Sequence, residues 1–339
     1  MKIPKAVKLP SGSWNVKLMV DGVRLSITAP TKKAAEAKAA AVKMGMTSVR
    51  HPQDLTVSDA IDRYIDSKDA VLSPSTILGY RKLRANTLQA LMGLPVSSLT
   101  QEAVQLAVND MARTKSPKYV KNAHGLLKAA LQVCRPDFVL QTTLPQQGKP
   151  DITIPTTEEV QRIAQFVKGK KFELPFLLAA GLGLRTSEIR GLTWACVGEE
   201  SIHIKYAMVD GPDGPALKLT KTYSSDRVLS VPPYIMQLIN ARPRTDEYVV
   251  HYNRNQLYKC LERACNSLGL PHHRFHDLRH YQASVMLALN VPNKYAQERM
   301  GHATDIMLKT VYQHTMRQKS EKLAADMNAF FDANISPQK

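Results

Sequence analysis

A polar, proline-rich segment divides this chain in two. Residues 141–155 read QTTLPQQGKPDITIP, with three prolines and one glycine. Proline fixes its own φ angle and lacks a backbone N–H, so neither a helix nor an inner strand continues through such a segment. We expect an extended linker over residues 139–155. The chain's 339 residues are enough for two or three domains around it.

Helix start signals fill the region before the linker. Thr56 and Thr100 can each cap a helix, and proline occupies the first helical position after Ser73 and after Ser116. Apolar residues at helical spacing follow each start. In the second helix they are Ile77, Tyr80, Leu83 and Leu88. These signals predict a bundle of four short helices over residues 52–138.

The first fifty residues predict a smaller and different fold. Apolar and polar residues alternate from Trp14 to Val20 and again from Val23 to Thr28, which is the period of a half-buried strand. Asp21-Gly22 between them is a hairpin turn signal. A helix is expected from Lys32 to Met44. Residues 1–50 therefore predict a small domain of one β-hairpin and one helix.

Residues 156–339 predict a mixed α/β domain with a terminal helix. Its expected elements are a helix opening at Thr156, strands at Ser201–Tyr206, Ala216–Thr220 and Val228–Val231, and helices at Leu257–Leu268, Asp277–Leu289, Lys294–Met300 and Arg317–Asn334. The predicted fold class is multidomain and mainly α. It comprises a small N-terminal β-hairpin/helix domain, a helical bundle and an α+β domain.

The charge balance favours a polyanionic partner. Lys and Arg number 46 against 29 Asp and Glu, a net charge of +17. Residues 1–50 alone hold 10 basic and 2 acidic side chains. Nucleic acid is the first candidate and an anionic membrane the second. The candidate DNA-binding residues are Lys17, Arg24, Arg81, Lys82, Arg84, Lys115, Lys118 and Lys121. The hairpin could also enter a DNA major groove, which accepts a two-stranded ribbon.

Other features argue against export and membrane insertion. No apolar run reaches the length of a membrane span, and the first residues lack the apolar stretch of a secretory signal. The four cysteines have no paired spacing, so we expect reduced thiols rather than disulfides or zinc ligands. We expect a cytoplasmic protein with no membrane partner.

Four short stretches of the C-terminal region carry chemistry. They are GLGLRTSEIRGLTW at 181–194, LTKTYSSDRVLSVPP at 219–233, HDLRH at 276–280, and MGH at 300–302 followed by Tyr312. Each stretch alone is weak, because a single Arg, His or Tyr is usually structural. Together and in this order, they resemble the signature of the tyrosine recombinases, the phage-integrase-like site-specific recombinases. The resemblance covers the whole chain.

The resemblance assigns six catalytic residues. They are Arg185, Lys221, His276, Arg279, His302 and Tyr312. Met300 replaces a leucine of the family pattern, which is a volume-conserving change. The resemblance also implies an arm-type DNA-binding domain at 1–50, a core-binding domain at 52–138, and a catalytic domain at 156–339 with a C-terminal docking helix.

The chemistry asks for these residue types. Cutting a phosphodiester without metal or ATP needs a nucleophile, cations on the non-bridging oxygens, and an acid for the leaving oxygen. Arg185 and Arg279 suit the phosphate because a guanidinium donates two parallel hydrogen bonds. Tyr312 would attack phosphorus and His276 would move the proton. By the resemblance, His302 binds a non-bridging oxygen and Lys221 protonates the departing 5′-oxygen.

The partners follow from this hypothesis. We expect double-stranded DNA at core and arm sites, a homo-tetramer on that DNA, no cofactor, and an excisionase or DNA-bending host protein as a further partner. Lys205 and Lys218 remain alternatives to Lys221, and Glu188 is expected to position Arg185. The alternative functions are a type IB topoisomerase-like enzyme, a non-enzymatic DNA-binding regulator and an RNA-binding protein. The sequence leaves a phage or conjugative-transposon origin open.

Overall fold

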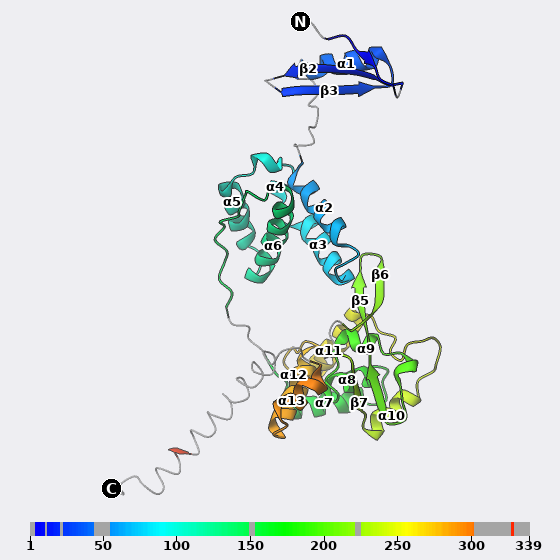
Figure 1. Ribbon diagram of the computed structural model, residues 1–339. Coiled ribbons are helices and arrows are strands. Elements are labelled where there is room, and N and C mark those ends of the chain that lie inside the picture. The colour runs from blue at the N-terminus through cyan, green and yellow to red at the C-terminus, as the bar shows by residue number, and fades with distance from the viewer. Residues whose placement is uncertain are drawn as a thin grey trace, which may run out of the picture. The chain divides into compact units, whose positions relative to one another are not determined.

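The computed structural model describes residues 4–10, 12–20, 23–43, 55–148, 153–220, 225–301 and 327–328. The chain divides into two compact units (Figure 1), which are Met1–Ala70 with Tyr80–Gln147, and Val71–Gly79 with Gly148–Lys339. Within the described ranges, none of the helices combines the length and the apolar character that crossing a membrane requires.

The N-terminal part of the first unit is an antiparallel sheet covered by one helix. Its elements are β1 (Val7–Lys8), β2 (Trp14–Val20), β3 (Val23–Ala29) and α1 (Lys32–Lys43). Val16 and Leu18 point to one face of β2 and pack in one core with Ala35 and Ala39 of α1. Lys17 lies exposed on β2 between them. The predicted hairpin and helix are confirmed, and β1 adds a short third strand.

The rest of the first unit is helical. Its elements are α2 (Val57–Lys68), α3 (Pro74–Asn86, whose first turns fall in the second unit), α4 (Gln89–Met92), the 3-10 turn η1 (Val96–Ser98), α5 (Gln101–Ala112) and α6 (Pro117–Cys134). The predicted caps are confirmed at Thr56, Thr100 and Ser116, whose side chains accept backbone N–H groups of the first turn. The four predicted helices are therefore present.

One residue of this region was predicted wrongly. Leu88 does not continue the apolar stripe of α3, because that helix ends at Asn86. Its φ of 52° lies in the left-handed region, and it precedes α4. The change of direction keeps the Leu88 side chain buried while the chain turns back.

The second unit is built around one buried helix. Its elements before the strands are α7 (Thr157–Val167), α8 (Glu173–Ala180), α9 (Thr186–Arg190) and the 3-10 turn η2 (Trp194–Cys196). Those after the strands are α10 (Pro233–Asn240), α11 (Arg254–Ser267), α12 (Asp277–Ala288) and α13 (Asn293–Met300). Helix α8 contacts α7, α9, α10 and α12. It is apolar nearly all round, as expected of a central helix.

The strands of the second unit form two separate antiparallel pairs. They are β4 (Ser201–Ile204) with β7 (Arg227–Ser230), and β5 (Tyr206–Gly211) with β6 (Gly214–Leu219). The predicted strand Ser201–Tyr206 is therefore wrong in extent, because the chain leaves one pair for the other at Lys205. Arg190 of α9 donates to Asp210 of β5 at 2.8 Å, which ties this hairpin to α9.

The last described helices of the second unit share a small core. Ala283 and Met286 of α12 pack with Ala296 and Met300 of α13. The predicted tail helix, Arg317–Asn334, lies outside the described residues except for Met327 and Asn328, which are helical.

A glycine links α8 to this core. Gly183 has a φ of +70° and follows α8 in a turn closed by two backbone hydrogen bonds, from Gly183 to Ala179 and from Leu184 to Leu178. A Cβ at this position would lie 2.7 Å from the sulfur of Met300. Glycine is thus required both by the left-handed backbone and by the close approach of α13.

Replacing this glycine separates the two requirements. We expect Gly183→Ala to lower the free energy of unfolding by about 1–2 kcal/mol for the left-handed conformation, and by roughly 1 kcal/mol more for displacing Met300. Gly169→Ala is the matched control, because its φ is +75° and nothing lies within 4 Å of the position that an added Cβ would take. Urea unfolding of both variants measures the difference. Equal losses would show that Met300 moves aside without cost.

Candidate active site

Arg185 stands at the start of α9 and is held by the third residue of that helix. The Arg185 backbone N–H donates to the Glu188 carboxylate at 2.9 Å, and the Arg185 guanidinium donates to the same group at 2.5 Å. A second guanidinium nitrogen donates to the carbonyl of Gly301 at 2.7 Å. The Arg185 side chain is 31% exposed, so it still reaches solvent. The predicted role of Glu188 in positioning Arg185 agrees with this geometry.

Arg279 comes from the first turn of α12 and is buried. Its guanidinium donates to the carbonyls of Gly183 and Met300. One of its nitrogens lies 3.9 Å from the carboxylate of Glu188. Burial, and then the charge of Arg185, lower the pKa of Arg279 to about 9, so it remains charged at neutral pH. Two arginines far apart in the sequence therefore meet at one carboxylate.

A third arginine lies at the Glu188 carboxylate, and Arg185, Arg227, Arg279 and Glu188 together form an arginine cluster. Arg227, the first residue of β7, donates from both terminal nitrogens to the two oxygens of Glu188, at 3.0 and 3.3 Å. Arg227 ends the motif that begins at Lys221, but the motif assigned it no role. Its place six residues after Lys221 was the only signal in the sequence, because the contact with Glu188 depends on the fold.

The Glu188 carboxylate is ionised within this cluster. Burial alone would raise its pKa, but the charge and hydrogen bonds of Arg227 and then the charges of Arg185 and Arg279 outweigh burial. They lower the pKa of Glu188 to about 2. Three cations thus surround one anion, and the cluster keeps an excess of positive charge.

The C-terminal end of α13 contributes three further acceptors to these arginines. The carbonyl oxygens of residues 299–301 each accept a hydrogen bond from a different arginine. The donors, in chain order of the acceptors, are Arg227 at 2.8 Å, Arg279, and Arg185 at 2.7 Å. Carbonyls at a helix C-terminus lack partners within the helix and carry partial negative charge, so cations are favoured there. The helix ends at Gly301, whose φ of 62° is left-handed, and the arginines satisfy the carbonyls at that end.

Two histidines lie beside Arg279. His276 directly precedes α12, and its ring meets that of His280 edge-on with centroids 4.9 Å apart. Burial, and then His280 and Arg279, lower the pKa of His276 to about 4. Burial also lowers the pKa of His280. Both rings are therefore neutral at pH 7, and a neutral imidazole can accept a proton.

Three of the predicted catalytic residues, Lys221, His302 and Tyr312, lie outside the described residues. In the sequence, Lys221 comes two residues after the end of β6, and His302 directly follows Gly301. The structure describes both alternatives to Lys221. Lys205 lies between β4 and β5 with its ammonium 5.6 Å from the ring centroid of Tyr206, and Lys218 lies on β6.

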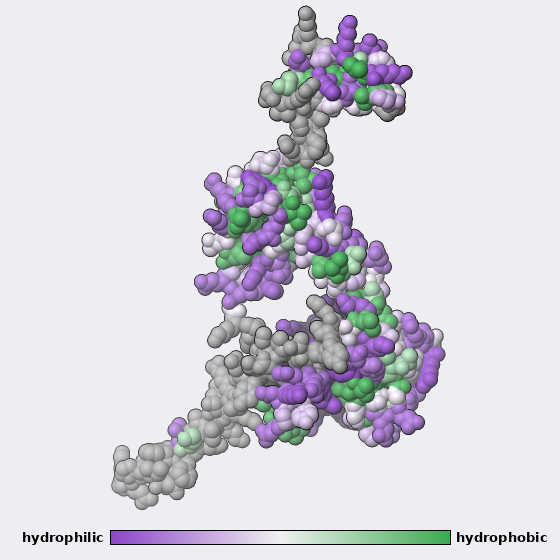
Figure 2. Space-filling view, in the orientation of Figure 1, coloured by the Kyte–Doolittle hydropathy of each residue, from purple (hydrophilic) through white to green (hydrophobic). Residues whose placement is uncertain are grey.

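The predicted DNA-binding residues of the first unit are mostly exposed. Side chains exposed to solvent are Lys17, Arg81, Lys82, Lys115, Lys118 and Lys121. Arg84 differs, because it donates to Asp62 at 2.9 Å and its charge is matched within the chain. Arg24 lies on β3, and its side chain is outside the described part of the structure. Figure 2 shows hydrophilic residues over much of the visible surface of the helical part of the first unit.

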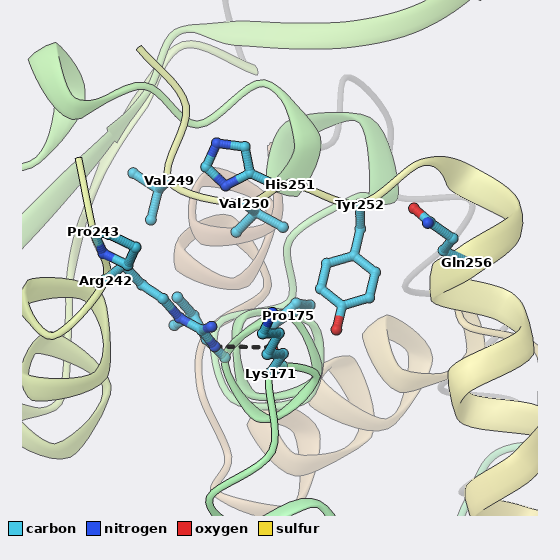
Figure 3. A pocket seen from close by; sticks show the side chains of 10 residues that line it. Lys171, Pro175, Arg242, Pro243, Val249, Val250, His251, Tyr252 and Gln256 are labelled. Atoms are coloured by element: carbon cyan, nitrogen blue, oxygen red, sulfur yellow. Dashed lines mark hydrogen bonds between the residues drawn. The ribbon is translucent and has the colours of Figure 1, made fainter. Parts of the chain in front are cut away.

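A pocket in the second unit is separate from the arginine cluster (Figure 3). It is lined by Lys171, Leu174, Pro175, Arg242, Pro243, Val249, Val250, His251, Tyr252 and Gln256. The guanidinium of Arg242 donates to the carbonyl of Lys171 at 2.8 Å. Of the predicted catalytic residues that the structure describes, Arg185, His276 and Arg279 do not line this pocket. Within the described ranges, no group of three His, Cys, Asp or Glu side chains is arranged to hold a metal ion.

Comparison with known proteins decides the family. The family model described as "Phage integrase family" matches residues 155–319, which contain the arginine cluster. Residues 155–319 belong to the phage integrase family. This integrase is therefore a site-specific tyrosine recombinase that binds DNA, as the motifs predicted.

Relatives of this integrase agree along most of its length. The "Tyrosine recombinase XerC-like" protein of Caldanaerobacter subterraneus subsp. tengcongensis is 23% identical over 363 aligned residues, covering 91% of this chain and 92% of the relative. The integrase of Mycobacterium phage L5 is 23% identical and covers 69% of this chain and 68% of its own length.

Solved structures share the fold. The Tn1549 transposon integrase bound to transposon right end DNA has a TM-score of 0.63 at 20% identity, over 79% of this chain and 99% of that one. A lambda integrase dimer bound to a core site has a TM-score of 0.58 at 16% identity, over 91% of this chain and 94% of that one. These similarities confirm the predicted fold class, including the N-terminal sheet and the α/β region.

The depressed pKa of His276 predicts an acid-sensitive fold. Between pH 6.5 and about 4 the unfolded histidine binds a proton that the folded one does not, so stability is full above pH 6.5 and falls as the pH drops through this window. We expect the contribution of His276 to reach at most about 3 kcal/mol. His276→Asn should flatten the dependence of unfolding free energy on pH over this range.

Urea unfolding at a series of pH values measures this slope. The control is His272→Asn, which changes an exposed histidine four residues earlier and should leave the slope as in the wild type. If His276→Asn and the wild type lose stability in parallel, another group carries the acid sensitivity.

Proposed function

We propose that this integrase cuts and rejoins DNA through a 3′-phosphotyrosyl intermediate on Tyr312, integrating and excising a mobile element. The observation that carries the proposal is the convergence of Arg185 and Arg279 on Glu188. These are the two arginines that the motifs assign to the scissile phosphate. Their meeting in one cluster supports the assignment, because they come from separate helices.

The charge of the cluster suits a phosphoryl transition state. A phosphodiester carries one negative charge, and attack by a phenolate would give a pentacoordinate phosphorus with two. Three arginines against one carboxylate leave two unmatched positive charges. Such a site stabilises the transition state more than the bound substrate, which is the condition for a faster reaction.

The arginines also retain hydrogen-bond donors for the phosphate. A guanidinium has five N–H groups. Among hydrogen bonds to described residues, the side chains of Arg185 and Arg279 each use two. The exposed part of Arg185 gives the phosphate access, and the carbonyls and Glu188 keep both groups in place before DNA arrives.

The proposed reaction balances without a cofactor. His276, neutral at pH 7, takes the phenolic proton as Tyr312 attacks phosphorus, and Lys221 gives a proton to the 5′-oxygen as its bond to phosphorus breaks. His302 donates to a non-bridging oxygen. A 5′-hydroxyl from a second strand then attacks the phosphotyrosine and releases Tyr312. The phosphotyrosyl bond conserves the energy of the cleaved bond, so no ATP is needed.

The other regions acquire roles in the same proposal. Residues 1–50 form the arm-type DNA-binding domain, and residues 52–138 form the core-binding domain. Residues 139–155 link them to the catalytic domain at 156–339. The cluster of exposed lysines at the start of α6 supports a phosphate contact there. The proposal places the protein in the cytoplasm with its DNA.

Exchange of strands between two duplexes needs four cuts, so four chains are proposed to assemble on DNA. A lambda integrase tetramer bound to a Holliday junction shares this fold with a TM-score of 0.55 at 16% identity. We place the link between subunits in the tail helix Arg317–Asn334, whose apolar residues include Leu323, Phe330 and Phe331. An excisionase or a DNA-bending host protein would set the direction of recombination.

A nicked suicide duplex tests the covalent step. The duplex carries the end of the element that encodes the integrase, and its nick lets the cleaved fragment diffuse away. The wild type should accumulate a DNA adduct that survives denaturing gel electrophoresis. Tyr312→Phe should bind the duplex and form no adduct, because it lacks the attacking hydroxyl.

The matched control is Tyr295→Phe, which removes a hydroxyl from a tyrosine of α13 that is 65% exposed. Its adduct yield should equal that of the wild type. An undiminished adduct in Tyr312→Phe would refute the assignment. Joined products from two sites, rather than relaxed supercoils alone, distinguish the integrase from a topoisomerase-like enzyme.

Deleting residues 1–50 tests the arm-binding domain. The deletion should abolish binding to distal arm sequences and leave cleavage at a core site intact. Within the domain, Lys17→Ala should weaken arm binding and reduce the salt dependence by about one released counterion. Lys38→Ala is the control, since Lys38 is exposed on α1, which covers the opposite face of the sheet. Equal effects of both lysines would exclude the sheet face as the binding surface.

A further inference from the structure

We infer that Arg227 is a positioning residue that holds together three described segments of the active site: Ser225, four residues after Lys221 in the sequence, the start of α9 with Arg185 and Glu188, and the end of α13 that precedes His302. The inference deepens the proposed function and rests on it. The sequence motifs assign no role to Arg227.

The contacts of Arg227 reach all three segments. Its Nε donates to the carbonyl of Arg299 at 2.8 Å. One terminal nitrogen donates to the carbonyl of Ser225 at 3.1 Å, and both donate to the carboxylate of Glu188. Ser225 lies four residues after Lys221 in the sequence, and Glu188 holds Arg185. One side chain therefore connects segments that the sequence keeps far apart.

Only arginine has the shape for this task. The four hydrogen bonds leave the planar guanidinium in several directions, and two of them run side by side to one carboxylate. A lysine ammonium is a compact charge with three donors and cannot reproduce the paired contact. The side chain of Arg227 is 6% exposed, compared with 31% for Arg185. Among hydrogen bonds to described residues, Arg227 uses four of its five side-chain donors, whereas Arg185 and Arg279 use two each and keep more donors for a phosphate.

Removing Arg227 should change how Glu188 titrates. The charged groups facing Glu188 are Arg185 from α9, Arg227 from β7 and Arg279 from α12. Arg227 is the strongest of the three influences that lower the pKa of Glu188 against burial. Without it, the pKa of this carboxyl rises, and protonation at mildly acidic pH would release Arg185.

Single-turnover cleavage of the suicide duplex tests the inference. Arg227→Lys and Arg227→Gln should bind the duplex with near wild-type affinity and cleave it on the order of 100-fold more slowly or worse, comparable to the loss of one oriented donor in an oxyanion site. Cleavage by Arg227→Gln should fall further as the pH drops from 7 toward 5, more steeply than that of the wild type, whereas Arg227→Lys keeps a positive charge beside Glu188 and should keep the wild-type pH profile. This added acid dependence would not arise from a general loss of packing.

Two further variants keep the inference testable if Arg227→Gln fails to fold. Arg227→Gln combined with Glu188→Gln removes the buried charge along with its partner, and it should lose the added acid dependence while remaining slow. Arg190→Lys is the matched control, because Arg190 is 3% exposed and pairs with Asp210 instead. It should cleave within several-fold of the wild type with an unchanged pH profile.

The outcomes separate the two levels of the hypothesis. If the wild type forms no adduct, the proposed function fails. If the wild type cleaves and folded Arg227→Lys cleaves within about fivefold of it, or folded Arg227→Gln shows the wild-type pH profile, then Arg227 is structural and the inference is wrong.

Discussion

The site depends on one buried carboxylate. Glu188 accepts hydrogen bonds from the side chains of Arg185 and Arg227 and lies 3.9 Å from Arg279. Without it, three guanidinium groups would repel one another in a poorly hydrated place, and a buried charge without a partner is costly. The carboxylate matches only part of their charge. A site balanced in this way is stable without DNA and still favours a phosphate.

The helix end beside this cluster gives it a second role. Carbonyls at the C-terminus of α13 need donors, and the three arginines need acceptors. The arginines donate to these carbonyls, so both sets of groups gain partners. The same contacts orient the arginines and hold the end of α13, from which the chain continues to His302. Backbone oxygens at the end of α13 thus connect the arginines, which come from three separate elements, to the segment that precedes His302.

Much of the fold could be predicted because its signals are local. The caps at Thr56 and Thr100, and the hairpin turn Asp21-Gly22, act within a few residues, and the elements they predicted are present. Features set by packing were missed. Helix α8 is apolar nearly all round and shows no helical stripe, and Leu88 leaves the pattern of α3 because that helix ends at Asn86.

The site was predictable only in part for the same reason. The motifs named Arg185 and Arg279, and they named Glu188 as a neighbour three residues away in the same turn. They did not predict that Arg227 completes the cluster, since that contact crosses between a strand and a helix. Nor did they predict that backbone carbonyls share in the binding. Such acceptors leave no trace in residue identity.

The three carbonyls at the end of α13 also restrict how this region can vary in length. Each residue of an α-helix advances 1.5 Å and turns about 100°. Inserting or deleting one residue between Asn293 and Gly301 would therefore rotate all three oxygens away from their arginines. The turn at Pro212 and Asp213, between β5 and β6, carries no such restriction, because neither residue contributes to the cluster. Among related integrases, length differences should accumulate in that hairpin and avoid the last helix before His302.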